Sequence, residues 1–125
     1  MNIFYNVLKK TEVRPAMWTG EQSLKSIAIF LSGYRTALQE YLPDELNQNS
    51  ITDFNNWVAK KLRFGSSTAG WQLMIVADTL KLDPKNIDWE HIESTMTKEQ
   101  HLLSIRRFYE LLEEWRQVET QIKMN

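Results

Sequence analysis

The sequence contains no cysteine among its 125 residues. This absence excludes disulfide bonds, thiolate nucleophiles, iron–sulfur clusters and cysteine-ligated zinc sites. It also leaves no sign of an oxidising compartment, and the first ten residues lack the charged-then-apolar layout of a secretory signal. We therefore expect a cytoplasmic protein.

An excess of one charge and long apolar runs are missing too. Lysine and arginine number 15 against 16 aspartates and glutamates, so the net charge is -1. No global basic field is available to gather nucleic acid or anionic lipid. Polar residues interrupt every apolar stretch within a few positions, so we expect no membrane-spanning helix. The length and the 42% of hydrophobic residues fit one folded domain over residues 1–125.

Signals for β-structure are equally scarce. The sequence has no Asn-Gly or Asp-Gly hairpin pair and no sustained alternation of apolar and polar residues. Only in residues 1–8 does a short strand compete with a helix. The sequence therefore predicts an all-α fold, an irregular bundle of four main helices with further short helices, because the expected loops differ in length.

The clearest periodic signal lies in residues 21–41. Ile29 and Phe30 fall outside the apolar stripe of this helix, which favours a central position, and Pro43 ends it. Gly33 lies inside the helix, where glycine costs about 1 kcal/mol relative to alanine, so we expect another element to approach closely there. The stripe repeats at spacings of three and four: Leu24, Ile27, Leu31, Tyr34, Leu38 and Tyr41.

Three more helices are expected. The first covers residues 52–63, and the second follows the loop 65–70, whose hydroxyls are expected to cap it, and ends at Asp83-Pro84. The last begins at a capping box formed by Thr97 and Gln100 and continues to the end of the chain.

Catalytic and metal-binding patterns are poorly represented. The two histidines, His91 and His101, are not at the i, i+4 spacing of a helical zinc site, and no Gly-x-Ser-x-Gly elbow exists. We therefore expect no enzyme, no metal and no cofactor. Catalysis by a cluster of carboxylates stays open only if one of them has a raised pKa in a cleft.

A basic segment offers an alternative function. Lys60–Arg63 ends one expected helix, and Ser66–Thr68 lies in the loop that follows. Cations at a helix C-terminus complement its dipole, which accounts for them without a ligand. The alternative is a small regulatory or adaptor domain that binds a peptide or nucleic acid through residues 60–68, with an affinity that falls as salt rises.

A set of short motifs resembles a known family. Residues 14–20 read Arg-Pro-Ala-Met-Trp-Thr-Gly, where that family usually has Arg-Pro-Gly-Met-Tyr-x-Gly. The other matching segments are Phe30-Leu-Ser-Gly-Tyr34, Phe54-Asn-Asn-Trp-Val-Ala-Lys-Lys61, Ala69-Gly-Trp71 and Phe108-Tyr-Glu-Leu-Leu112. Together they cover most of residues 12–115 and are similar to small bacterial toxin-immunity proteins. Ala16 and Trp18 depart from the family pattern.

The resemblance implies an immunity protein that binds and neutralises a cognate toxin domain, for instance in contact-dependent growth inhibition. Arg14 is expected to tie its loop to a carboxylate or to carbonyls, with a toxin contact as the alternative. Gly70 and Trp71 are expected to let two helices meet closely. The motif residues given structural roles are Arg14, Pro15, Met17, Gly33, Tyr34, Trp57, Gly70 and Trp71.

An acidic face is the candidate toxin-binding surface. Many toxins delivered into neighbouring cells are nucleases with basic substrate channels, which an acidic face would attract. Pairing of these carboxylates with Arg106 and Arg107 on a solvated surface is the alternative. We expect a monomer whose partner is the toxin domain rather than a membrane or nucleic acid. The candidate residues are Glu90, Glu93, Glu110, Glu113 and Glu114.

Overall fold

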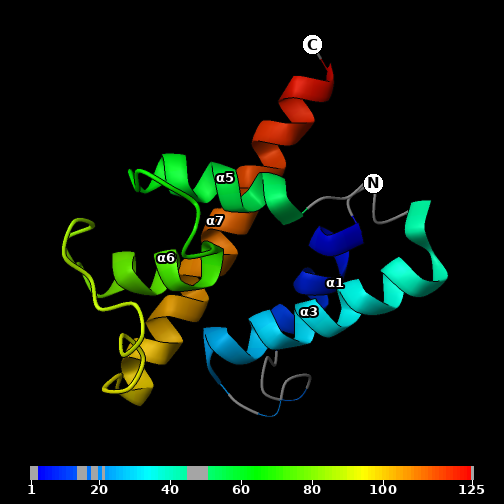
Figure 1. Cartoon of the computed structure of the whole chain (residues 1–125). Coiled ribbons are helices and arrows are strands. Elements are labelled where there is room, and N and C mark those ends of the chain that lie inside the picture. Colours follow the sequence, from blue (N-terminus) through cyan, green and yellow to red (C-terminus); the bar gives the residue numbers. More distant parts are fainter. Residues whose placement is uncertain (1–2, 14–16, 18–19, 21, 45–50, 125) are drawn as a thin grey trace.

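A computed structural model describes residues 3–13, 17, 20, 22–44 and 51–124 (Figure 1). No described residue lies in a strand, which confirms the all-α prediction, and residues 3–8 belong to a helix. None of the described helices is long and apolar enough to span a membrane. The main helices are α1 (Ile3–Glu12), α3 (Leu24–Tyr41), α5 (Ile51–Lys61), α6 (Trp71–Thr79) and α7 (Lys98–Met124).

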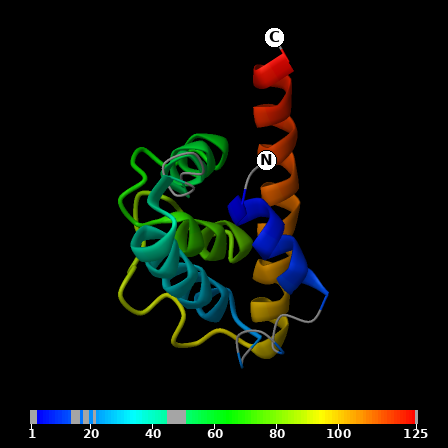
Figure 2. The ribbon, with the colours of Figure 1, turned by 90° about the vertical axis from the view of Figure 1, so that its right-hand side faces the viewer.

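Helix α7 is the central element of the bundle. It has 27 residues, so it is about 40 Å long, and it contacts all four of the other main helices. Its last turns project beyond the rest of the molecule (Figure 2). The side chains that it buries are Ser104, Ile105, Phe108, Tyr109, Leu111, Leu112 and Trp115.

An aromatic cluster forms the centre of the core. The fully buried Phe54 of α5 lies 5.9 Å from the ring of Trp71 on α6 and 5.2 Å from that of Trp115 on α7. The rings of Trp71 and Phe108 stack 4.8 Å apart. Such pairs contribute about 0.5–1.5 kcal/mol each beyond the area that they bury. Three helices are therefore joined through one set of rings.

The predicted central position of the helix at 21–41 is wrong. Helix α3 contacts α6 and α7, and it buries Leu24, Ile27, Leu31 and Leu38 on one side only. Ile29 is 62% exposed and Tyr41 75% exposed, so both point away from the core. The apolar stripe therefore ends at Leu38, and the central position belongs to α7.

The close approach of another element expected at Gly33 and at Gly70 is not found. A Cβ added at either glycine would have no described atom within 4 Å, apart from its chain neighbours and, at Gly33, the backbone of its own helix. Gly33 is exposed on α3. Gly70 has φ +88°, a backbone conformation that residues with a Cβ rarely adopt. This conformation explains why a glycine occupies the position.

The start of α6 also differs from the prediction. The N-cap residue is Gly70, which offers no side chain, and Asn55 of α5 accepts a hydrogen bond from the Trp71 N–H at 2.8 Å. The hydroxyl of Ser67 donates instead to Oδ1 of Asn56. The predicted capping box of α7 is confirmed: the Thr97 N–H donates to Gln100 Oε1 and the Gln100 N–H to Thr97 Oγ1.

Helices α5 and α6 end in the same way, with a cationic residue in the left-handed region. After α6, Lys81 has φ 58°, its N–H donates to the Asp78 carbonyl, and the Leu82 N–H donates to the Ala77 carbonyl. After α5, Arg63 has φ 65°, its N–H donates to the Lys60 carbonyl, and the Phe64 N–H donates to the Ala59 carbonyl. This Schellman arrangement ends α6 at Thr79, one turn before the predicted Asp83-Pro84.

Replacing Lys81 with glycine should therefore stabilise the protein. A residue with a Cβ costs roughly 1–2 kcal/mol in the left-handed region, a cost that glycine avoids, so we expect a gain of about 1 kcal/mol. Urea denaturation of Lys81→Gly measures it. The matched control is Lys85→Gly, because Lys85 lacks a positive φ and should lose a little stability. Equal changes in both variants would contradict this explanation.

Candidate functional site

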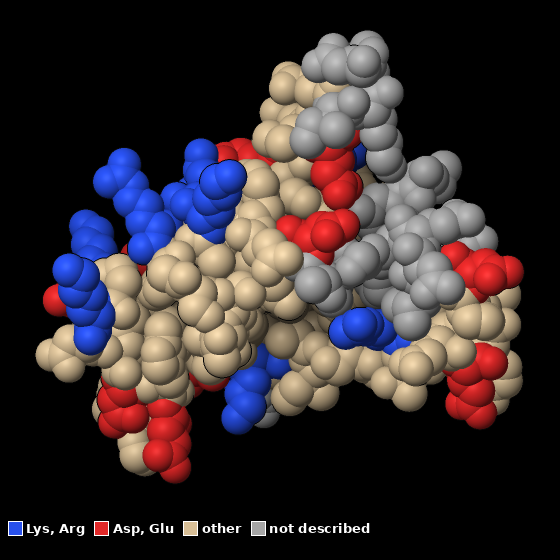
Figure 3. Space-filling view, turned by 45° about the horizontal axis from the view of Figure 1, so that its top comes forward, with Lys and Arg blue, Asp and Glu red and all other residues tan. Residues whose placement is uncertain are grey.

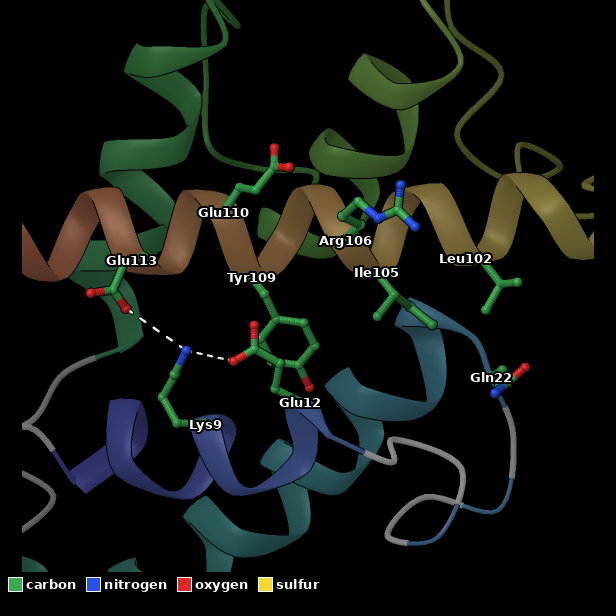
Figure 4. Close-up of a pocket in the computed structure, with 9 residues that line it drawn as sticks. All are labelled: Lys9, Glu12, Gln22, Leu102, Ile105, Arg106, Tyr109, Glu110 and Glu113. Atoms are coloured by element: carbon green, nitrogen blue, oxygen red, sulfur yellow. Dashed lines mark hydrogen bonds and ion pairs between the residues drawn. The ribbon is translucent and has the colours of Figure 1, made fainter.

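A groove separates α1 from α7 (Figure 4). Its volume is about 520 Å³, within the usual range of binding pockets. Leu102, Ile105 and Tyr109 give it an apolar side, and charged side chains surround them. The described lining consists of Lys9, Glu12, Gln22, Leu102, Ile105, Arg106, Tyr109, Glu110 and Glu113. Two of the five predicted acidic residues thus lie at this groove.

The floor of the groove is a buried tyrosine. Tyr109 is only 5% exposed, and its hydroxyl forms a hydrogen bond with Oγ1 of Thr11 on α1. The Thr11 hydroxyl proton is directed to the Leu8 carbonyl, so the Tyr109 O–H is the donor in this pair. Burial raises the pKa of Tyr109 to about 12. The phenol therefore stays neutral and joins α1 to α7.

A polar network closes one end of the groove. Glu113 accepts a hydrogen bond from the Tyr5 hydroxyl at 2.6 Å and lies 3.9 Å from Lys9 Nζ. Lys9 also pairs with Glu12, and this bond raises the pKa of the lysine. Arg116 lies 3.5 Å from Glu113 and 4.8 Å from the centre of the Tyr5 ring. Each pair is partly exposed and weak by itself, but together they hold α1 against α7.

The other carboxylates of α7 have different partners. Glu114 pairs with Lys61 of α5 at 3.2 Å. Glu110, on the rim of the groove, lies 3.6 Å from Arg107, which also pairs with Asp78 of α6 at 3.3 Å. Glu113 therefore faces α1 while Glu114 faces α5. The three residues share a helix but do not form one unpaired acidic surface.

Glu90 and Glu93 lie in the turns between α6 and α7. Glu90 is exposed and Glu93 is half-buried. In the same turns Asp88 accepts a hydrogen bond from His91, which lowers the pKa of Asp88. Glu90 and Glu93 therefore lie on a different segment of the chain from Glu110, Glu113 and Glu114, which belong to α7. No group of three or more potential metal ligands occurs in the part of the chain that the structure describes.

The motif residues divide into three groups. Arg14 and Pro15 lie outside the described residues. Trp71 is buried against Phe54 and Phe108, and Tyr34 and Trp57 are half-buried beside the core. Met17 and Gly33 are exposed, and Gly70 has the positive φ that the backbone adopts before α6.

Part of the alternative binding segment, residues 60–68, makes contacts within the fold. Lys60 and Arg63 are exposed, whereas Lys61 pairs with Glu114. Phe64 packs against Trp89 at 5.8 Å, which attaches this loop to the turns before α7. Lysine and arginine side chains gather on the left of the face shown in Figure 3.

Sequence reasoning missed the residues that α1 brings to the groove. Tyr5, Lys9 and Thr11 meet Glu113 and Tyr109 across about a hundred positions of the chain. The apolar spacing of the last helix contained Tyr109, but no local pattern indicates which helix it faces.

Raising the pH should weaken the fold through Tyr109. The pKa of Tyr109 is higher in the native state than in the unfolded chain. The contribution of the neutral phenol to the free energy of unfolding is therefore fully present below about pH 10 and is lost between about pH 10 and pH 12. Urea denaturation of Tyr109→Phe should therefore show a smaller loss at high pH than the wild type. Thr11→Val keeps the buried phenol, so it should retain the wild-type pH dependence although it loses a hydrogen bond. A flat pH profile in Thr11→Val would show that burial is not the cause.

No family model matches this chain, and neither a curated protein nor a solved structure matches it. The immunity hypothesis therefore depends on the sequence motifs and on the surface of the molecule itself.

Proposed function

We propose that this chain is an immunity protein that binds and neutralises a cognate bacterial toxin domain by protein–protein contact. The observation that supports the proposal is the groove between α1 and α7, which combines an apolar side with charged residues of both signs. Protein interfaces have the same composition, with an apolar centre inside a polar rim. The motif resemblance points to the same function.

The proposed partner is a nuclease, and the surface charges fit that choice. Glu90 and Glu110 are exposed, and the one ion pair of Glu110 among the described residues joins it to Arg107 at 3.6 Å. Exposed carboxylates at the edge of an interface attract a basic partner over a distance and increase the association rate more than the lifetime of the complex. The ion-paired Glu113 and Glu114 hold α1 and α5 in place, so their main contribution is to the scaffold.

Growth rescue tests the proposal most directly. The C-terminal domain of the protein encoded immediately upstream is expressed in bacteria with and without the chain, and calorimetry measures the affinity of the two purified proteins. Rescue together with nanomolar binding is the expected result. If neither occurs, a nucleic-acid titration at two salt concentrations tests the segment 60–68.

Reversing the charge of Glu110 should slow association with the toxin domain. We expect Glu110→Lys to lower the association rate severalfold at low salt, with the difference shrinking at high salt because salt screens surface charges. Stopped-flow fluorescence measures this rate. Glu99→Lys makes the same charge change about three turns away on α7 and should have a smaller effect. Equal rates for Glu110→Lys and the wild type would exclude Glu110 from the contact region.

A further inference from the structure

A second cleft lies where the start of α6 meets α3 and α5. Its volume is about 270 Å³, just below the usual range of pockets for drug-sized ligands, so it suits a small ligand. It shares no described lining residue with the groove between α1 and α7. Helix α6 contacts both α3 and α5, so packing between helices holds the cleft in shape. Its described polar lining consists of Ser32, Arg35, Asn55 and Gln72.

All the polar side chains of the described lining can donate hydrogen bonds, and none of them is acidic. Arg35 is exposed and forms no ion pair among the described residues. Asn55 accepts the N–H of Trp71 with its Oδ1 atom, so its Nδ2 group remains as a donor. A negative ligand therefore meets no like charge in the described lining. The carboxylates of the three helices lie outside that lining: Glu40, Asp53 and Asp78.

The first turn of α6 adds backbone donors. Gly70 is the N-cap residue, so the N–H groups that follow it have no acceptor within the helix. Asn55 accepts the first of them, while those of Gln72 and Leu73 have no acceptor among the described residues. The N-terminus of a helix attracts anions through such groups and through its dipole. The loop before α6 contains no lysine, unlike a P-loop, and Arg35 of α3 supplies the positive charge instead.

Gln72 has a side-chain donor that the fold does not satisfy. Its Nε2 atom is buried and has no hydrogen-bond partner, and no other buried side-chain nitrogen or oxygen of the described residues is in this state. A buried donor without an acceptor is unfavourable in the free protein, so such a group calls for an explanation. Gln72 lines the cleft, and an oxygen atom of a ligand there would be the acceptor that the fold lacks.

We propose that this cleft binds a phosphate group, either free phosphate or the phosphate of a small monoester. Arg35 would pair with two of its oxygens, because the planar guanidinium matches phosphate in a bidentate way. The first-turn N–H groups of α6 and the side chain of Gln72 would donate to the others. Donors from three helices suit a tetrahedral anion better than a planar carboxylate. The apolar Ala28 and Leu31 would contact the rest of a monoester. This inference does not depend on the immunity function.

Binding is measured on the full chain with two probes, inorganic phosphate and phenyl phosphate. We expect calorimetry to give a Kd of about 1 mM or lower for at least one probe. In ¹H–¹⁵N NMR spectra the backbone N–H signals of Gln72 and Leu73 and the side-chain amide signals of Gln72 should shift as the probe is added. Tighter binding of phenyl phosphate would indicate a monoester as the ligand, and equal binding would indicate free phosphate.

Gln72→Leu is the decisive variant. Leucine removes the buried donor and forms helix as readily as glutamine, so the variant should unfold at the same or a higher temperature. Its affinity for the phosphate probes should nevertheless fall severalfold. The matched control is Gln39→Leu, which makes the same change at an exposed position of α3 outside the lining and should bind like the wild type. Lower stability with unchanged affinity in Gln72→Leu would assign the residue to the fold alone and overturn its role in binding.

A second pair of variants tests the charge. Arg35→Gln and Lys25→Gln each remove one positive charge from an exposed position of α3, but only Arg35 lines the cleft. We expect Arg35→Gln to lower the affinity about tenfold or more, because charge-assisted hydrogen bonds to phosphate are lost, and Lys25→Gln to lower it less than about twofold.

Three results would overturn the inference. Equal losses in Arg35→Gln and Lys25→Gln would mean that the overall charge of α3 attracts phosphate and the cleft does not. Unchanged NMR signals of Gln72 and Leu73 at millimolar phosphate would exclude the start of α6. Binding of benzoate as tightly as phenyl phosphate would show that the cleft does not select a tetrahedral anion. None of these results bears on growth rescue, so the immunity function is tested separately.

Discussion

The structure depends on the burial of one side of α7 against the aromatic side chains of α5 and α6. Phe54 touches the rings of Trp71 and Trp115, and Trp71 stacks on Phe108. Because these rings come from three helices, removing any one of them would leave a cavity among all three. The positions of α5 and α6 follow from this cluster, and Asn55 then satisfies the first N–H of α6 directly beside it.

The attachment of α1 has a different physical basis. Besides the apolar Leu8 and Val7, the helix is held by hydrogen bonds and ion pairs of Tyr5, Lys9 and Thr11 with α7. Such polar contacts contribute less in water than apolar burial of similar extent. The groove lies beside this polar seam, between α1 and α7 (Figure 4).

The surface contains two kinds of carboxylate. Glu113 and Glu114 are matched by cations from neighbouring helices and act within the fold. Glu40 has no ion pair among the described residues and lies in the last turn of α3, where the negative end of the helix dipole is unfavourable for a carboxylate. A residue that is unfavourable in the free protein is a better candidate for function than one that the fold already uses.

The amino-acid pattern by itself determined the all-α class, the helices around residues 24–38, 54–61 and 98 onward, and the capping box of α7, since each depends on residues within a few positions of one another. It did not determine that α7 rather than α3 is central, that Asn55 caps α6, or that Gly33 faces solvent. Those features depend on contacts between distant segments, and apolar spacing indicates that a side is buried but not what buries it. The tertiary structure also decided which carboxylates are neutralised, because ion pairs such as Lys61–Glu114 form only once the helices have packed.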